Sequence, residues 1–472
     1  MAMSVKIISE EKIKPSSPTP ETQKHLKFSF LDQLALPVYV PVLLFYAPGG
    51  DDNQTSKSHR LKASLSKALA QYYPFAGRVQ DNNVSIHCND EGAIYVEAQV
   101  NCRLSNVLNQ LNVDSLNQFL PFSIASSDSA KGCILLVQTT SFQCGGITIG
   151  LLMSHKITDA SSISSFINTW TAIAVAGDDS NATISQLPLP EFVSDSVLQP
   201  PQDFQVATPT SDTGIHAKGV TKRLVFEGSK ITALKAKAAS ARVEQPTRVE
   251  AVAGLIWKCA IAASKSTSGV SKACVLGQAV NLRKRLEPNL SDTSIGNLLG
   301  FITPETKAGA AEEIELQEVV GLLREGIAEF KKSGYKKYQD TEAYLEFFKT
   351  MTDPDGPYSS DKNFYLCSSW SRFGFYETDF GWGCPVWFIG GLSMFSNFFL
   401  LMDTRDGRGI EALVTLSEED MAVFQRDEDL LAFASFNPDV IQVADSKGSS
   451  TLCEGKSTSE VAVGSDVQVL SV

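Results

Sequence analysis

Apolar residues recur along the chain with the two periods that distinguish helices from strands. A leucine recurs every four positions from Leu61 to Leu69, which predicts a helix over 56–73. Similar stripes predict further helices over 163–173, 229–242, 251–263, 312–333 and 337–352. Thr247 and Glu250 form a capping-box pattern in front of the helix at 251–263.

Runs rich in Ile, Leu, Val, Phe and Thr predict strands between these helices. They cover 132–142, 147–153, 220–226, 397–402 and 409–414. Residues 85–88 and 93–96 flank the turn-forming segment 89–92, which predicts a hairpin. Because strands and helices alternate, we expect a mixed α/β fold.

Three polar segments divide the chain. Residues 1–20 are rich in proline, 194–219 carry prolines among Ser, Thr, Asp and Gly, and 437–472 contain no aromatic residue. These features predict an N-terminal half over 1–193, a linker over 194–219, a C-terminal half over 220–436 and a disordered tail over 437–472.

The composition is that of a globular protein, with 43% hydrophobic and 20% charged residues. The formal net charge is -12 and no run rich in Lys and Arg occurs, which argues against a nucleic-acid partner. The longest apolar stretch, 34–46, is interrupted by Pro37 and Pro41 and is too short to cross a bilayer. The first residues lack the apolar core of a secretory signal, so we expect a cytoplasmic protein with no membrane partner.

The 9 cysteines are scattered along the chain, and no Cys-x-x-Cys pair occurs. This pattern predicts reduced thiols in place of a disulfide framework or a zinc site. No bound metal is therefore expected.

Of the 5 histidines, His155 is the best placed for catalysis. It lies where a predicted buried strand ends and a helix begins, a junction that holds a side chain firmly while its tip faces a cleft. Asp159 follows in the pattern His-x-x-x-Asp and can either orient the histidine or cap the helix. The spacing alone also fits a core histidine followed by a capping aspartate.

A second motif, Asp379-Phe380-Gly381-Trp382-Gly383, lies in the C-terminal half. We call it the Asp379 pentad. Its first three residues match a kinase motif, but the Gly-rich nucleotide loop and the His-Arg-Asp loop of kinases do not occur in the sequence. No Walker-type phosphate loop or dinucleotide fingerprint occurs either. The glycines favour a turn that two buried aromatics anchor.

Together, His155-x-x-x-Asp159 and the Asp379 pentad resemble the signature motifs of the plant BAHD acyltransferase family. The resemblance covers the chain from roughly residue 8 to 435, and it is greatest to the vinorine-synthase-type alkaloid O-acetyltransferases and their relatives. Other matching segments are Leu31-Asp32-Gln33, Tyr73-Pro74-Phe75-Ala76-Gly77-Arg78, Asn281-Leu282-Arg283, Gly296-Asn297 and Ser369-Trp370-Ser371-Arg372.

The resemblance implies a monomer of two α/β domains similar to chloramphenicol acetyltransferase, with mixed sheets flanked by helices and a solvent channel between them. Acyl-CoA, with acetyl-CoA favoured by likeness, would be a co-substrate and not a tightly bound cofactor. It would meet a small-molecule alcohol, an alkaloid or terpenoid, at His155 as general base. Asp159 would pair with Arg283 as a brace, the Asp379 pentad would be structural, and Ser368 and Trp370 would be candidates for oxyanion contacts.

Other interpretations stay open from the sequence. A malonyl-, benzoyl- or hydroxycinnamoyl-CoA transferase would share the scaffold and differ in the acyl donor. A non-catalytic binding protein of the same fold would have no use for His155. A hydrolase would need a nucleophile, and no Gly-x-Ser-x-Gly elbow occurs.

Overall fold

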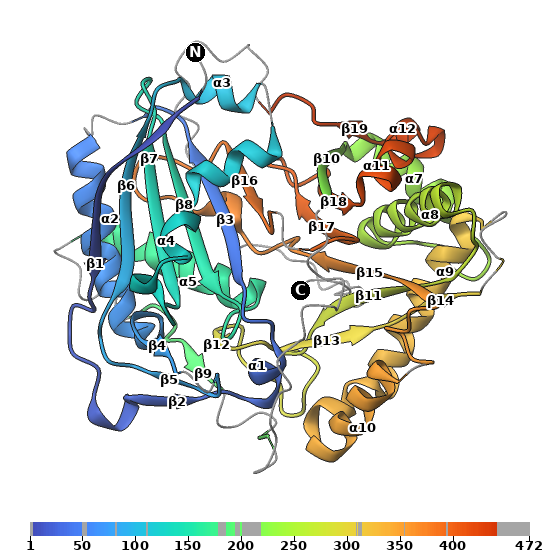
Figure 1. Cartoon of the computed structure of the whole chain (residues 1–472), viewed down its shortest axis with the longest axis horizontal. Helices are drawn as coiled ribbons and strands as arrows, with labels where there is room; N and C mark the ends of the chain where they lie inside the picture. Colours follow the sequence, from blue (N-terminus) through green and yellow to red (C-terminus); the bar gives the residue numbers. More distant parts are fainter. Residues whose placement is uncertain are drawn as a thin grey trace.

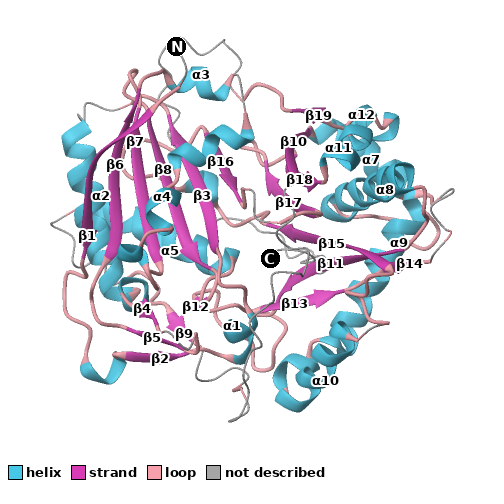
Figure 2. Cartoon of the chain, in the orientation of Figure 1, coloured by secondary structure: helices cyan, strands magenta, loops and turns pink. Residues whose placement is uncertain are grey.

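The computed structural model describes residues 3–49, 54–80, 83–109, 112–177, 186–193, 199–200, 219–307, 309, 314–353, 355–392 and 395–440. The predicted linker and tail fall almost entirely outside these residues. The described part contains two large mixed sheets that lie side by side with helices around them (Figures 1 and 2). None of its helices has the length and apolar character needed to cross a membrane.

The first sheet has six strands in the order β1-β6-β7-β8-β3-β16. In that order they span Val5–Ile13, Ala93–Val100, Leu135–Ser141, Ile147–Ser154, Tyr39–Tyr46 and Trp387–Gly390. Helices α2 (Gln54–Gln71) and α5 (Ala160–Ala176) pack against each other beside this sheet (Figure 1). The predicted strands at 132–142 and 147–153 are present as the antiparallel pair β7 and β8.

The second sheet has the order β13-β11-β15-β17-β18-β10-β19, and β14 pairs with β11. Its strands span Leu299–Ile302, Ala273–Asn281, Lys362–Ser369, Phe398–Asp403, Ile410–Leu416, Val220–Phe226, Ser435–Phe436 and, for β14, Glu305–Thr306. The helices around it are α7, α8, α9, α11 and α12 (Figure 2), which span Gly228–Ala238, Arg248–Ser268, Leu316–Glu329, Glu418–Phe424 and Glu428–Phe433. Thr247 and Glu250 form the capping box that begins α8, as predicted.

Shorter elements complete the described part. A three-stranded sheet has the order β2-β5-β4, and β9 pairs with β12. These strands span His25–Lys27, Ser85–His87, Arg78–Val79, Glu191–Phe192 and Ser294–Ile295. The remaining α-helices, α1, α3, α4 and α10, span Phe30–Leu34, Leu104–Leu108, Phe122–Ala125 and Thr341–Thr352.

The predicted hairpin around 89–92 is wrong, because its two strands belong to different sheets. β5 pairs with β2 and β4, whereas β6 lies between β1 and β7. The carboxylate of Asp90 accepts hydrogen bonds from the backbone N–H and the hydroxyl of Thr19 at 2.9 and 2.6 Å. The segment therefore joins two sheets, since longer non-local ladders on both sides of β6 prevail over local pairing.

Two segments cross between the halves that the sequence predicts at 1–193 and 220–436. β16 pairs antiparallel with β3, so a strand of the C-terminal half completes the first sheet. In the other direction, Phe30 and Leu31 of α1 are buried in the core of the second sheet. The boundary along the sequence is therefore not a boundary between the two cores.

Seven cysteines of the described part are free, and most of them are buried. Cys384 is disulfide-bonded, so the prediction of reduced thiols is wrong at this position. The sequence pattern missed it because an isolated cysteine has no local partner that would mark a bridge. Within the described residues, no group of three or more His, Cys, Asp or Glu side chains could hold a metal ion.

A buried polar cluster connects the two sheets. Arg223 of β10 donates through Nε to Oε2 of Glu411 on β18 at 2.6 Å. The indole N–H of Trp387 on β16 donates to the same oxygen at 3.1 Å. The guanidinium of Arg223 also lies 5.4 Å from the centroid of the Trp387 ring. All three residues are buried, and Nη1 of Arg223 also donates to the backbone carbonyl oxygen of Pro438 at 2.8 Å, so Glu411 is the only charged partner of Arg223 within this cluster.

We expect Glu411→Ala to lower the free energy of unfolding by ~3–5 kcal/mol, because it removes the carboxylate that neutralises the buried charge of Arg223. Urea denaturation followed by tryptophan fluorescence measures this change. The control is Glu21→Ala, which removes an exposed ion pair with Lys24 and should cost less than about 1 kcal/mol. An equal, small effect of both substitutions would contradict the interpretation.

Candidate active site

His155 lies in the turn between β8, which ends at Ser154, and α5, which begins at Ala160. Its backbone N–H donates to the carbonyl oxygen of Val38 at 2.8 Å, so the strand end next to β3 fixes the backbone of the residue. The residue is partly exposed. This is the strand-to-helix junction that the sequence predicts.

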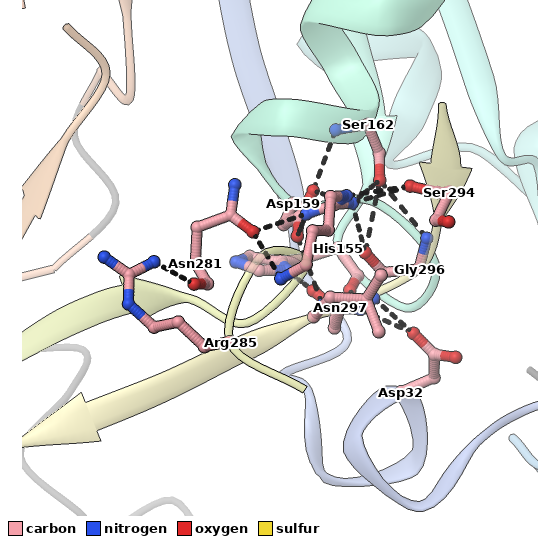
Figure 3. A network of polar contacts seen from close by, with 11 residues as sticks. Asp32, His155, Asp159, Ser162, Asn281, Arg285, Ser294, Gly296 and Asn297 are labelled. Atoms are coloured by element: carbon pink, nitrogen blue, oxygen red, sulfur yellow. Dashed lines mark hydrogen bonds and ion pairs between the residues drawn. The ribbon is translucent and has the colours of Figure 1, made fainter. Parts of the chain in front are cut away.

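The ring of His155 is held by Asn297, which lies 142 positions later in the sequence (Figure 3). Nδ1 of His155 lies 2.9 Å from Oδ1 of Asn297. The side-chain amide nitrogen of Asn297 donates to the backbone carbonyl oxygen of His155 at 2.6 Å. With Nδ1 engaged, Nε2 is the ring nitrogen that is left for a reacting group. Gly296-Asn297 matches a segment of the family in the sequence, but the sequence pattern predicts no role for Asn297.

The surroundings of His155 favour its neutral form. Burial of the ring lowers the pKa of His155 below its usual value. Hydrogen bonding to its own backbone and to Asn297, and the negative charges of Asp159 and Asp32, oppose this only in part. An imidazole with a lowered pKa is unprotonated at neutral pH and can accept a proton.

Asp159 pairs with Arg283 in a buried ion pair. Nη1 and Nη2 of Arg283 donate to the two carboxylate oxygens at 2.8 and 3.0 Å, and both side chains are fully buried. Asp159 also caps α5 by accepting from the backbone N–H of Ser162 at 2.8 Å. Burial alone would raise the pKa of Asp159, but the charge and hydrogen bonds of Arg283 outweigh it, so the pKa is lowered.

Arg283 is held on its other side by backbone oxygens. Its Nε and Nη2 donate to the carbonyl oxygen of Ser294 at 3.0 and 2.8 Å. The backbone N–H of Leu298 donates to Oδ2 of Asp159 at 3.1 Å. The ion pair therefore connects the turn that carries His155 to the segment that carries Asn297.

The two oxyanion candidates lie near the end of β15. Ser368 is partly exposed, and Trp370 is only 6% exposed. The Trp370 ring packs against Phe375 and Phe388, with centroids 5.8 and 6.3 Å apart. No hydrogen bond in the described part connects either residue to His155, so their oxyanion role stays a prediction.

The Asp379 pentad forms a turn against the N-terminal elements. Oδ1 of Asp379 accepts from the backbone N–H groups of Gly381 and Gly383 at 2.7 and 2.9 Å. Both glycines have a φ near +100°, a conformation that other residues rarely adopt. Phe380 is fully buried, and its ring meets the Trp170 ring edge to face at 4.9 Å.

The pentad is remote from His155. Tyr39 of β3 pairs with Ser154, next to the histidine, and Tyr46 at the other end of β3 contacts Phe380. At about 3.3 Å per residue, these two ends of β3 are roughly 23 Å apart.

Two cavities border these regions. The larger, about 2170 Å³, is lined by Asp379, Gly381 and Trp382 at the pentad end of β3. The smaller, about 940 Å³, is lined by the first turns of α5, by Asn281 and Arg285, and by Arg372. The lining of the smaller cavity includes Asn281 and Arg285, which Figure 3 shows to one side of the cluster around His155. His155 itself is not among the described residues that line it.

Comparisons with known proteins agree with this picture. The model of the Transferase family matches residues 3–431. Stemmadenine O-acetyltransferase of Catharanthus roseus is 36% identical over 90% of this chain and 97% of its own length. A 17,18-epoxy-17-hydroxycur-19-ene N-malonyltransferase of Strychnos nux-vomica is 38% identical over 92% of this chain and 91% of its own length. The crystal structure of vinorine synthase superposes with a TM-score of 0.75 at 32% identity, covering 93% of this chain and 100% of that one.

We expect Asp159→Ala and Arg283→Met each to lower the free energy of unfolding by ~3–5 kcal/mol, because each leaves one fully buried charge unpaired. The double variant should cost clearly less than the sum, which a double-mutant cycle of urea unfolding measures. Additive effects would contradict a coupled pair. The pKa of Asp159 is lower in the folded state than in the unfolded chain. The contribution of Asp159 to the free energy of unfolding is therefore fully present above the unfolded-state pKa of about 3.9, and it is lost as the pH falls through the folded-state pKa.

Proposed function

The chain belongs to the BAHD acyltransferase family, and on that premise we propose that it transfers an acetyl group from acetyl-CoA to a hydroxyl of a plant specialised metabolite, an alkaloid or terpenoid alcohol. His155 acts as the general base. The observation that carries this proposal is the His155–Asn297 contact, which leaves Nε2 as the working nitrogen. An acetyltransferase name among the relatives supports the choice of donor.

The proposed reaction proceeds in one direct displacement. Nε2 of His155 takes the proton of the acceptor hydroxyl as its oxygen attacks the thioester carbonyl, a step worth ~10²–10⁴-fold in rate. The tetrahedral oxyanion needs preplaced donors, each worth on the order of 3 kcal/mol, and we propose Ser368 and Trp370 for this role. Collapse breaks the C–S bond, and the imidazolium of His155 protonates the departing CoA thiolate.

In this proposal Asp159 and Arg283 take no part in proton transfer. The two groups form an ion pair with each other. The carboxylate also caps the N-terminus of α5, and the guanidinium also donates to the carbonyl oxygen of Ser294. They act as a brace that positions the turn of His155. The Asp379 pentad is likewise structural, supported by its roughly 23 Å offset along β3.

The proposal includes the protein's setting. We infer a monomer in the cytoplasm that works on small molecules, without nucleic acid or membrane. The net charge of -12 supports the absence of a nucleic-acid partner, and the seven free cysteines of the described part support a reducing compartment, although Cys384 is disulfide-bonded. Light scattering of the purified chain and the location of a fluorescent fusion would test the two points.

We expect His155→Ala to reduce kcat by at least ~10²-fold while the chain stays folded, because it removes the base and leaves the brace intact. A thiol-release assay with acetyl-CoA and a pooled extract of plant alcohols, with mass detection of the product, measures turnover. His59→Ala, an exposed histidine on α2, is the matched control and should keep the wild-type rate. More than a few per cent of wild-type activity in His155→Ala would remove the base assignment.

The thiol-release assay can also be run across a range of pH, where the pH dependence of kcat/KM tests the role of His155 as base. Because burial lowers the pKa of His155, the base stays neutral to lower pH than a free histidine does. The acidic limb of kcat/KM should therefore fall below pH ~6.5. A complete lack of CoA release from every donor would favour a non-catalytic binding protein of this fold.

A second donor is favoured by one observation. Arg285 is half-buried at the smaller cavity, and its Nη1 donates to the backbone carbonyl oxygen of Asn281 (Figure 3). A guanidinium at this place suits the free carboxylate of malonyl-CoA, and one relative is named an N-malonyltransferase.

We expect acetyl-CoA to support faster CoA release than malonyl-, benzoyl- or coumaroyl-CoA when each is supplied at equal concentration. A faster rate with malonyl-CoA would replace the first candidate with the second. In that case Arg285→Gln should lower the malonyl-CoA rate about tenfold more than the acetyl-CoA rate, because one charge-assisted hydrogen bond is lost. Lys230→Gln, which changes an exposed cation of α7 that does not line this cavity, should leave the ratio of the two rates unchanged.

A further inference from the structure

Asp32 is a fully buried carboxylate that contacts the histidine's partner and that the mechanism above does not use. It lies on α1, far from His155 in the sequence and next to Asn297 in space (Figure 3). Oδ1 of Asp32 accepts from the backbone N–H of Asn297 at 2.8 Å and from its side-chain Nδ2 at 3.0 Å. We propose that Asp32 is a positioning residue that sets, through Asn297, which nitrogen of His155 carries the proton.

The argument begins with the two N–H bonds of the Asn297 amide. One donates to Asp32 and the other to the backbone carbonyl oxygen of His155 at 2.6 Å. A flipped amide would place its oxygen against these two acceptors, so both contacts would become repulsive. The orientation of Asn297 is therefore determined by acceptors on two sides.

The oxygen of the Asn297 amide determines the tautomer of His155. With Nδ2 turned toward Asp32, Oδ1 of Asn297 faces Nδ1 of His155 at 2.9 Å. An amide oxygen only accepts, so Nδ1 must carry the hydrogen. The neutral ring then has its lone pair on Nε2, which is the tautomer that a base acting from Nε2 requires. The hydrogen-bond geometry that fixes the tautomer does not depend on the proposed function. Only the catalytic value of this tautomer rests on it.

Asp32 is held rigidly enough for this task. Its Oδ2 accepts from the backbone N–H and the hydroxyl of Ser29 at 3.2 and 2.7 Å, in the capping box of α1. The ammonium of Lys156, next to His155, donates to the carbonyl oxygens of Gln33 and Ala35 at 2.9 and 3.1 Å. Both ends of this short helix are thus tied down close to the catalytic turn.

The experiment reads the tautomer directly by nitrogen NMR of the full chain labelled with ¹⁵N-histidine, at pH 8. The sequence has 5 histidines, and a His155→Ala sample identifies the signal of interest. We expect the wild type to show the hydrogen on Nδ1. A wild-type signal with the hydrogen on Nε2 would overturn the proposal without any variant of Asp32.

The variants separate positioning from support of the fold. Asp32→Ala should shift His155 toward the Nε2–H tautomer and lower kcat at least about tenfold, with KM for acetyl-CoA within about threefold of wild type. Asp32→Asn keeps an acceptor for Asn297 and should restore the Nδ1–H tautomer. Ser29→Ala breaks the same capping box but leaves the contact between Asp32 and Asn297, so its tautomer should be that of the wild type.

A matched control comes from the other capping box. Glu250 is a fully buried capping carboxylate of α8, and its hydrogen bonds go to Thr247 and Arg324, which lie outside this cluster. Glu250→Gln should change stability and leave the His155 tautomer unchanged. Retention of the Nδ1–H tautomer in Asp32→Ala would refute the proposal. Because the NMR signal needs no turnover, that result is distinct from a failure of the acyltransferase proposal, which would appear as a lack of CoA release.

Discussion

The buried ion pair between Asp159 and Arg283 is the interaction on which the rest of the site depends. Asp159 caps α5 immediately after the turn of His155, and Arg283 follows β11 of the second sheet. Both charges are fully shielded from water. A buried charge is tolerated only with a partner in good geometry. The pair therefore links the turn after β8 to the segment after β11, and Asn297 lies against the ring of His155 in this arrangement.

The candidate catalytic residue and the aromatic packing of the Asp379 pentad lie at opposite ends of β3. At the end near Tyr39, His155 contacts the polar side chain of Asn297. At the end near Tyr46, the aromatic rings of the Asp379 pentad pack against N-terminal elements. β16 follows the pentad and joins the first sheet, and the cluster of Arg223, Glu411 and Trp387 ties it to the second. The interlocked sheets therefore give the site a stable frame.

This separation explains how relatives with the same frame can use different acyl donors. The contacts around His155 engage its Nδ1 and its backbone and do not distinguish one acyl donor from another. Selection then falls to the cavity walls, which come from α5, the segment after β11 and the segment after β15. Small changes in such walls shift preference by only ~1–3 kcal/mol each. A malonyltransferase and an acetyltransferase among similar relatives are consistent with this view.

The sequence by itself determined the local elements, because their signals lie within a few turns of chain. The leucine stripe of α2, the capping box of α8 and the apolar runs of β7 and β8 are of this kind. It also singled out His155, since a lone histidine at a strand-to-helix junction is a local feature. Its resemblance to a family supplied the partner of Asp159, which spacing alone left open.

Only the tertiary structure decided how distant segments combine. The hairpin at 89–92 failed because β6 pairs with strands that no local pattern reveals. β16 joins the first sheet from the second half of the chain for the same reason. Asn297 and Asp32 meet His155 across long stretches of sequence, and their roles depend on which atoms face each other. Local periodicity reports how a segment folds, whereas the orientation of an amide between two acceptors exists only once the segments have packed.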